Sequence, residues 1–224
     1  MRVKFCGVTN LDDAREAVRL GAWAIGLNHH RESPRHVSGE AAAEIAAELR
    51  RRIELVGVFV DPTLDELASA AENEFLSMVQ LHGDEGPAFC REAARRTGCK
   101  VIKALRVRSA ADVRRAEAYR TDFHLLDAHR PGQAGGTGES FDWELLSGRR
   151  STVPLILAGG LRPDNVAEAA AMAEPFAVDV ASGVEARPGV KDHALMAEFF
   201  ARAQAANPPA GAGLTAGAEL EPGR

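Results

Sequence analysis

Eight short apolar runs rich in β-branched side chains recur along the whole chain, and longer stretches of different character separate them. The runs lie at residues 3–6, 23–27, 55–60, 77–81, 100–105, 123–127, 153–158 and 176–180. The stretches between them, such as "NLDDAREAVRLGA" and "SGEAAAEIAAELRRR", place their apolar residues at helical spacing. The pattern predicts eight strands that alternate with helices.

Alternation of this kind favours a parallel sheet, because parallel neighbours need a crossover connection that a helix usually supplies. Eight such units close naturally into a (β/α)8 barrel, and 224 residues suit one domain of that kind. We therefore expect an α/β protein whose fold is a single-domain (β/α)8 TIM barrel. A doubly wound open sheet is the alternative.

Residues suited to helix ends stand between the predicted strands and helices. Polar or proline residues at expected helix starts are Asn10, Ser38, Thr63, Ser109 and either Pro163 or Asp164. Gly21 and Gly98 stand where helices are expected to end, because glycine readily adopts the left-handed conformation found there.

Net charge and cysteine usage limit the kinds of partner. A formal net charge of −5 speaks against binding to nucleic acid or to an acidic membrane surface, both of which need clustered Lys and Arg. No apolar run is long enough to span a bilayer, and the N-terminus lacks the layout of a signal peptide. Three cysteines without a CxxC pair fit a reducing compartment, so we expect a cytoplasmic protein.

The last 18 residues, 207–224, differ from the rest of the chain. They are dense in Pro, Gly and Ala and have no apolar periodicity, so they cannot bury enough surface to offset the entropy lost on ordering. We expect a barrel domain at residues 1–206 and a disordered tail at 207–224.

Two glycine-containing turns follow the last two predicted strands. Gly159 and Gly160 lie in "ILAGGL", and Ser182 and Gly183 lie in "VDVASGVE". Such turns let backbone N–H groups approach an anion closely, and the loops after strands seven and eight are the usual phosphate site of this fold. The two turns together predict a phosphate-binding site and a small phosphorylated substrate.

Two titratable residues end strands on the same predicted rim. Asp127 follows the apolar run "FHLL", and desolvation there favours the protonated form of a carboxyl, which suits a general acid. Cys6 can act as the base if nearby positive charge favours its thiolate. The alternatives are an aspartate that caps a loop or helix and a cysteine that packs as a small hydrophobe.

The motifs "VKFCGVT", "SPRHV", "VGVFV", "VQLHGDE", "VIKALRV", "LLDAHRPGQAGGTGESFDW", "LILAGGL" and "VDVASGVEARPGVKD" closely resemble, in order, those of the phosphoribosylanthranilate isomerase family. The resemblance extends from about residue 2 to residue 200. It implies an aldose–ketose isomerase of tryptophan biosynthesis, in which Cys6 is the general base and Asp127 the general acid. The reaction is an Amadori rearrangement, and it needs no metal or other cofactor because the substrate's own iminium acts as the electron sink.

The same resemblance implies roles for three further residues. Arg35, in "SPR", matches the arginine that pairs with the anthranilate carboxylate, and an arginine fork suits a planar carboxylate well. His82 and Asp179 match other substrate-binding positions. The alternatives are a surface arginine at position 35 and a structural histidine at position 82.

Two segments near the predicted mouth have unusual composition. The loop "RPGQAGGTG" contains Gly135 and Gly136, and its glycines predict a mobile loop that closes over substrate. Family members commonly carry "GFVFYPKSPR" where this chain has "GLNHHRESPR", so Asn28, His29 and His30 replace apolar residues expected around the anthranilate ring. Adjacent histidines on a strand end point to opposite faces, which disfavours a metal site.

Two other functions are compatible with the phosphate turns. An isomerase of histidine biosynthesis uses the same chemistry, alone or together with the tryptophan reaction, but such barrels typically carry Asp where this chain has Cys6. A non-catalytic phosphate-binding barrel is disfavoured because both Cys6 and Asp127 are present. The pattern does not distinguish a monomer from a homodimer.

Overall fold

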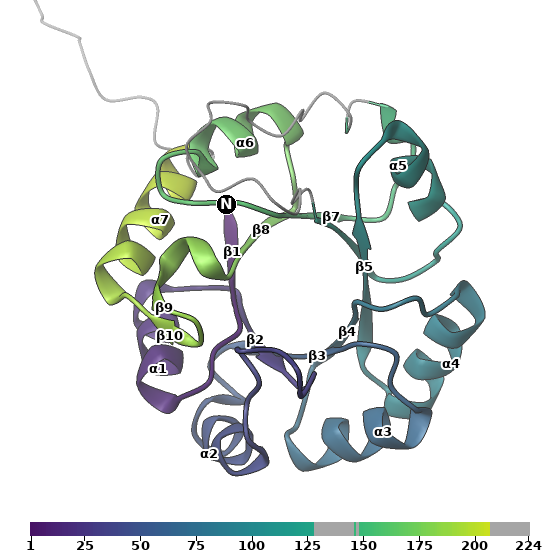
Figure 1. Cartoon of the computed structure of the whole chain (residues 1–224), viewed down its shortest axis with the longest axis horizontal. Coiled ribbons are helices and arrows are strands. Elements are labelled where there is room, and N and C mark those ends of the chain that lie inside the picture. The colour runs from purple at the N-terminus through teal and green to yellow at the C-terminus, as the bar shows by residue number, and fades with distance from the viewer. Residues whose placement is uncertain (128–145, 147, 207–224) are drawn as a thin grey trace, which may run out of the picture.

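Each of the eight predicted apolar runs forms a strand, and the strands pair in parallel in chain order. They are β1 (Arg2–Cys6), β2 (Ala24–Asn28), β3 (Glu54–Phe59), β4 (Met78–Leu81), β5 (Lys100–Arg106), β6 (Phe123–Asp127), β7 (Leu155–Ala158) and β8 (Ala177–Val180). Because β8 also pairs with β1, the sheet closes into the central ring of Figure 1. The predicted (β/α)8 barrel is confirmed, and the open-sheet alternative is wrong.

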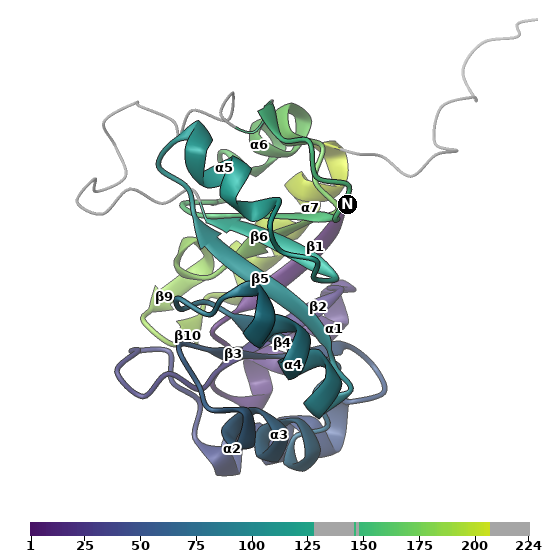
Figure 2. The same ribbon diagram turned by 90° about the vertical axis from the view of Figure 1, so that its right-hand side faces the viewer.

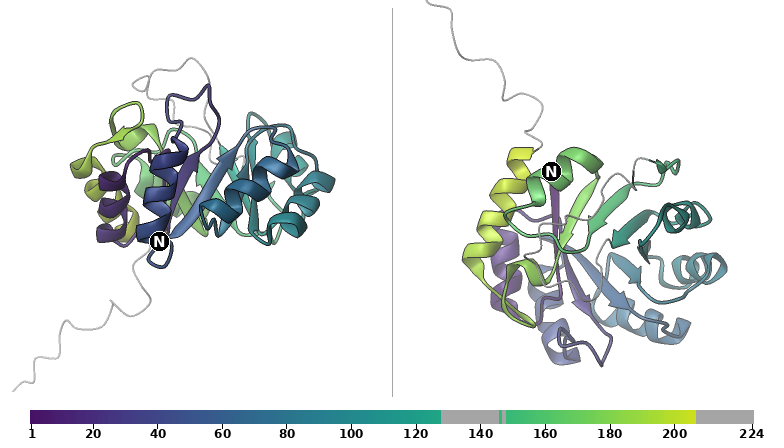
Figure 3. Two further views of the ribbon diagram at one scale, coloured as in Figure 1. Left: turned by 90° about the horizontal axis from the view of Figure 1, so that it is seen from below. Right: turned by 45° about the horizontal axis from the view of Figure 1, so that its top comes forward.

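The computed structural model describes residues 1–127, 146 and 148–206. Helices lie outside the strand ring, as both views of Figure 3 show. Those in the described residues are α1 (Leu11–Leu20), α2 (Gly39–Leu49), α3 (Leu64–Asn73), α4 (Pro87–Thr97), α5 (Ala110–Ala116), α6 (Val166–Ala173) and α7 (His193–Ala206). The predicted loop glycines Gly135 and Gly136 and the predicted tail at 207–224 lie outside the described residues.

Most of the expected helix ends are confirmed. The side chains of Asn10, Ser38 and Thr63 each accept a hydrogen bond from the first turn of the helix that follows, and Ser109 is the N-cap of α5. Gly21 and Gly98 end α1 and α4 with φ of 82° and 69°.

The prediction for the start of α6 was wrong, because its N-cap is Asn165 rather than Pro163 or Asp164. The side chain of Asn165 accepts a hydrogen bond from the N–H of Arg162 at 2.8 Å and so closes a local turn. Asp164 instead forms an ion pair with the guanidinium of Arg162 at 3.0 Å.

A short segment between β8 and α7 was not predicted. It contains a 3-10 turn, η2 (Ser182–Val184), and a two-stranded hairpin, β9 (Glu185–Arg187) and β10 (Val190–Lys191). The hairpin is too short to show periodicity in the sequence. Figure 2 shows it at one end of the barrel, with the N-terminus of the chain at the other.

The two ends of the barrel differ in chemistry. At the N-terminal end, the rings of Trp23, Phe123 and Phe176 pack with their centroids 5.1 to 5.6 Å apart. At the other end, the buried charged residues Lys4, Lys103, Asp179 and Lys191 lie on or after the strands. Because buried charges need partners, this polar end is where specific interactions concentrate.

Among the described residues, no helix combines the length and the apolar character needed to cross a membrane.

One buried ion pair fixes the loop after β4. The ammonium of Lys103 lies 2.6 Å from Oε2 of Glu85 and also donates to the carbonyl oxygens of Leu81 and Gly83. The other oxygen of Glu85 accepts from the backbone N–H groups of Asp61 and Gly83. This network holds the loop that carries His82.

We expect Lys103→Met to lower the free energy of unfolding by about 3 to 5 kcal/mol, because the substitution leaves the Glu85 carboxylate buried without its cation. Denaturant titration followed by circular dichroism measures the loss. Arg202→Met is the control, since it breaks an exposed pair with Glu198 and should cost about 1 kcal/mol or less. An equal effect of the two substitutions would contradict the structural role of the buried pair.

Candidate active site

The inner face of the barrel carries the predicted base and acid at the C-terminal ends of two strands. Cys6 ends β1 and Asp127 ends β6. Around the ring these strands are separated by β7 and β8. Phe5 and Leu126 belong to the outer core, the apolar layer between the strands and the helices. Because side chains alternate along a strand, their neighbours Cys6 and Asp127 point inward. The two groups therefore lie on the same rim of the barrel mouth.

The thiol of Cys6 stands beside a buried charge pair. Lys4 lies one inward position below it on β1, fully buried, and donates to Oδ1 of Asp179 at 2.7 Å. A Cβ placed on Gly26 would lie 2.8 Å from the Cys6 sulfur and 3.2 Å from the Lys4 nitrogen. The sulfur and the ammonium thus converge over a glycine of β2, whose missing side chain makes room for both.

Two opposing effects act on the Cys6 thiol. Burial raises the pKa of Cys6 above its ordinary value, because a thiolate is poorly solvated there, and the charge of Lys4 opposes that shift. Burial alone would lower the pKa of Lys4, but the carboxylate of Asp179 and the nearby Cys6 raise it overall. Lys4 is therefore a permanent ammonium beside the thiol.

Asp127, the predicted acid, has a histidine beside it. Nε2 of His82 lies 3.7 Å from Oδ2 of Asp127, and Nδ1 of His82 lies 3.5 Å from the side-chain amide of Gln80. Burial lowers the pKa of His82, although the charge of Asp127 acts in the opposite direction. The imidazole is therefore neutral near pH 7.

The two predicted phosphate turns are neighbours in space. Gly159 and Gly160 have φ of 97° and 64°, and Gly160 is exposed. Gly183, in η2, lies so close to the carbonyl oxygen of Leu161 that an added Cβ would collide with it. Ser182 is exposed beside it. The structure thus brings both turns to one patch of rim next to β7 and β8.

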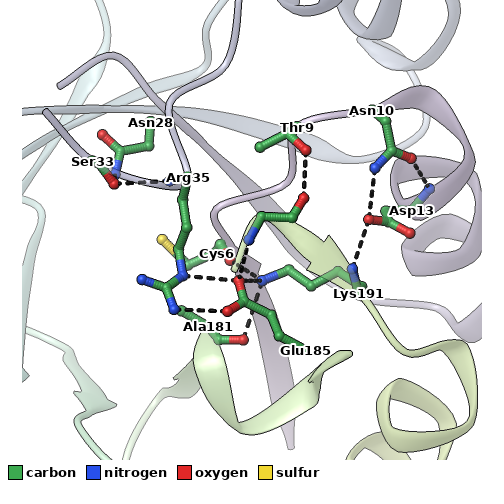
Figure 4. A network of polar contacts seen from close by, with 11 residues as sticks. Cys6, Thr9, Asn10, Asp13, Asn28, Ser33, Arg35, Ala181, Glu185 and Lys191 are labelled. Carbon is green, nitrogen blue, oxygen red and sulfur yellow. Dashed lines mark hydrogen bonds and ion pairs between the residues drawn. The ribbon is translucent and has the colours of Figure 1, made fainter. Parts of the chain in front are cut away.

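Arg35 lies in the loop after β2 and forms a two-pronged ion pair that was not predicted. Its Nε and Nη2 lie 2.8 and 2.7 Å from the two carboxylate oxygens of Glu185 (Figure 4). Lys191 also contacts Glu185, at 3.0 Å. Glu185 and Lys191 lie in the motif "VDVASGVEARPGVKD", but the sequence pattern gives no sign that they face a loop about 150 residues earlier.

Asp179 lies within the mouth but is mostly enclosed, with 8% of its surface exposed. Its position on β8 places it opposite Lys4 in the β1–β8 register. The structure therefore shows Asp179 as the partner of Lys4, and a contact with substrate stays a prediction.

His29 and His30 have separate partners. The ring of His29 stacks on Phe59 with centroids 4.6 Å apart, and its Nε2 lies 3.0 Å from Oε2 of Glu74. His30 lies 3.9 Å from the carboxylate of Glu32. Since Phe59 belongs to the outer core, His29 lies outside the barrel. In the part of the chain that the structure describes, no three His, Cys, Asp or Glu side chains form a group that could hold a metal ion.

A closed eight-stranded parallel barrel with titratable side chains at the C-terminal mouth is typical of the class of (β/α)8-barrel enzymes. A family model described as N-(5'phosphoribosyl)anthranilate (PRA) isomerase matches residues 3–202. The chain belongs to the N-(5'-phosphoribosyl)anthranilate isomerase family, whose members are aldose–ketose isomerases of tryptophan biosynthesis. The resemblance found in the sequence is confirmed.

Individual relatives agree with the family match. The chain is 48% identical over 204 residues to N-(5'-phosphoribosyl)anthranilate isomerase of Geobacter sulfurreducens, covering 91% of this chain and 98% of the relative. It is 47% identical to the isomerase of Acidithiobacillus ferrooxidans over 204 residues, covering 90% of this chain and 97% of that one.

Solved structures of the same family are similar in fold. The crystal structure of the isomerase from Thermotoga maritima superposes with a TM-score of 0.82 at 41% identity, covering 92% of this chain and 99% of that one. Another, in complex with reduced 1-(o-carboxyphenylamino)-1-deoxyribulose 5-phosphate, has a TM-score of 0.79 at 39% identity, with the same coverage.

Because burial raises the pKa of Cys6, its alkylation by iodoacetamide should reach half its maximal rate above the pH of about 8.5 typical of a free cysteine. Peptide mapping by mass spectrometry follows Cys6 separately from Cys90 and Cys99, and Cys6→Ser is the control. A half-maximal rate near pH 7 would contradict the environment described for the thiol.

Proposed function

We propose that the mouth of this barrel catalyses the Amadori rearrangement of N-(5-phosphoribosyl)anthranilate to 1-(2-carboxyphenylamino)-1-deoxyribulose 5-phosphate. The observation that carries the proposal is the placement of a thiol and a carboxyl on one rim, on strands β1 and β6, with two glycine turns beside β7 and β8. A phosphorylated sugar held at the turns would extend across the mouth, between Cys6 and Asp127.

The first step assigns the acid to Asp127. Its proton goes to the furanose ring oxygen, and the C1–O bond breaks as the anilino nitrogen donates its electron pair to form an iminium. His82, whose pKa burial lowers, lies 3.7 Å from Oδ2 of Asp127 and presents a neutral ring beside the carboxyl.

The second step assigns the base to Cys6. Its thiolate takes the proton from C2 of the sugar, and the C–H electron pair moves into the iminium to give an enolamine, which tautomerises to the ketose. Burial raises the pKa of Cys6 overall, and the buried ammonium of Lys4 supports this role because it offsets part of that rise in favour of the thiolate. The substrate's own iminium accepts the electron pair, so the reaction as written uses no cofactor.

Binding uses the ends of the substrate that do not react. We assign the phosphate to the backbone of Gly159, Gly160, Ser182 and Gly183, where N–H groups can donate to its oxygens, and of these residues Gly160 and Ser182 are exposed. We assign the anthranilate carboxylate to Arg35. His82 and Asp179 are expected to contact the sugar between these two anchors.

Other assignments follow from the sequence alone. A cytoplasmic location, the division into a barrel at 1–206 and a tail at 207–224, and closure of the loop that contains Gly135 and Gly136 stay predictions. So does the choice between a monomer and a homodimer. Activity on the aminoaldose substrate of histidine biosynthesis is the second candidate function, and an assay with that substrate tests it directly.

Purified protein should rapidly quench the fluorescence of N-(5-phosphoribosyl)anthranilate generated in situ. Cys6→Ser and Asp127→Asn should each slow the decay at least about a hundredfold, the range expected when a general base or acid is removed. Initial rates under matched protein concentration give the comparison.

Cys99→Ser is the matched control, since Cys99 lies just before β5, at the opposite end of the barrel, where its thiol donates to the carbonyl of Leu76. Its rate should equal that of the parent. No decay with the parent would contradict the proposed reaction, whereas decay that survives both site substitutions would contradict only the roles of Cys6 and Asp127.

A further inference from the structure

One edge of the Arg35 guanidinium is already occupied within the chain. Nε and Nη2, which form the side edge of the fork, donate to the two oxygens of Glu185. Nη1 has no hydrogen-bond partner among the described residues. The outer edge, formed by Nη1 and the second hydrogen of Nη2, is therefore left to accept another carboxylate.

Glu185 is itself held in place by further contacts. Its Oε1 accepts from the ammonium of Lys191 at 3.0 Å and from the N–H of Gly189 at 3.3 Å. Only 4% of the Glu185 side chain is exposed, against 25% for Arg35. Burial alone would raise the pKa of Glu185, but hydrogen bonds from Arg35 and the charge of Lys191 lower it overall. Glu185 is thus a fixed carboxylate rather than a mobile one.

Lys191 connects this carboxylate to the reacting end of the site. Its ammonium donates to the carbonyl oxygen of Cys6 at 2.6 Å and to that of Ala181 at 3.1 Å, and Figure 4 shows it pointing to both. Cys6 is the last residue of β1, and Ala181 comes directly before η2, which carries one of the proposed phosphate turns. Movement of Glu185 away from Lys191 would leave a buried ammonium without its counter-charge, which is costly.

Two glycines pack closely against the segment that carries Arg35, one against its side chain and one against its backbone. Gly7 has φ of 71°, and a Cβ there would lie 2.7 Å from Cδ of Arg35, so the aliphatic stem packs against the bare backbone of Gly7. Gly189 has φ of 79°, and a Cβ there would lie 2.9 Å from the carbonyl oxygen of Pro34. Both glycines are needed for backbone conformation and for space.

We propose that Glu185 is a positioning residue that fixes the plane of the Arg35 guanidinium, and that it thereby makes the site selective for a substrate with a carboxylate on its aromatic ring. The inference rests on the proposed function, because it requires Arg35 to bind that carboxylate. Glu185 occupies the side edge, Lys191 and Gly189 hold Glu185, and the substrate carboxylate pairs with the outer edge. The side chain of Glu185 does not touch the substrate.

Calorimetric binding of two reduced product analogues tests the proposal. One is reduced 1-(o-carboxyphenylamino)-1-deoxyribulose 5-phosphate, and the other is the same compound without the ring carboxylate. Glu185→Gln should weaken binding of the carboxylated analogue at least about tenfold, the scale of one charge-assisted hydrogen bond, because the amide turns the fork out of plane. Binding of the other analogue should change less than about twofold, since such losses apply only where the carboxylate is present.

Glu48→Gln is the matched control. Glu48 pairs with Arg15 through the same two-pronged geometry, at 2.8 and 2.7 Å, but on the exposed surface between α1 and α2. It should leave the affinity for both analogues unchanged. Glu185→Asp is the second variant if Glu185→Gln does not fold: it keeps the charge beside Lys191 but draws the carboxylate back from Arg35, and the same selective loss is expected.

Several results would overturn the proposal. Equal weakening of both analogues would mean that Glu185 only supports the fold, and tighter binding of the carboxylated analogue would mean that Glu185 competes for Arg35. A parent that binds both analogues equally would show that Arg35 does not recognise the ring carboxylate. If the parent binds neither analogue and has no isomerase activity, the proposed function itself fails, whereas an active parent with an unchanged affinity ratio in the variant overturns this inference alone.

Discussion

Burial of positive charge at the C-terminal end of the barrel is the constraint on which the rest of the site depends. An ammonium removed from water is stable only if a carboxylate and further acceptors surround it. Lys4 finds Asp179 across the β1–β8 seam, and Lys191 finds Glu185 together with the carbonyl of Cys6. Lys4 and Asp179 are 175 residues apart in the sequence, and Lys191 and Cys6 are 185 residues apart.

The same contacts therefore close the barrel and assemble the site. Asp179 reaches Lys4 only when β8 pairs with β1. The carboxylate of Asp179 then raises the pKa of Lys4, so that the ammonium beside the Cys6 thiol stays charged. The opposite end is packed differently, because the rings of Trp23, Phe123 and Phe176 contact one another there. The N-terminal end of the barrel is thus packed by aromatic rings, and the C-terminal end holds the titratable groups of the candidate site.

Local features of the fold could be predicted from the sequence, because they depend on residues close together in the chain. Strand runs and helix caps such as Thr63 and Gly21 were read correctly for this reason. The start of α6 was misjudged by one or two residues, since Asn165 and Asp164 are both good cap formers and stand next to each other in the sequence.

Contacts between distant segments could not be predicted in the same way. Cys6 and Asp127 were placed on the rim because each ends a strand, whereas Glu185 and Lys191 lie in the two short strands of a hairpin with no periodic signal. The pairing of Glu185 with Arg35 depends on how the loop after β2 meets that hairpin, which neither segment encodes alone. His29 likewise turned outward to Phe59 and Glu74, because strand alternation directs it away from the mouth.

A crystal structure of the Cys6→Ser variant with reduced 1-(o-carboxyphenylamino)-1-deoxyribulose 5-phosphate bound would test the central claim most directly. The account predicts the phosphate at the backbone N–H groups of Gly160 and Ser182, the sugar between residue 6 and Asp127, and the carboxylate on the outer edge of Arg35 with the Glu185 pair intact. A phosphate bound away from both glycine turns, or a sugar whose reacting carbons lie out of reach of residue 6 and Asp127, would contradict it.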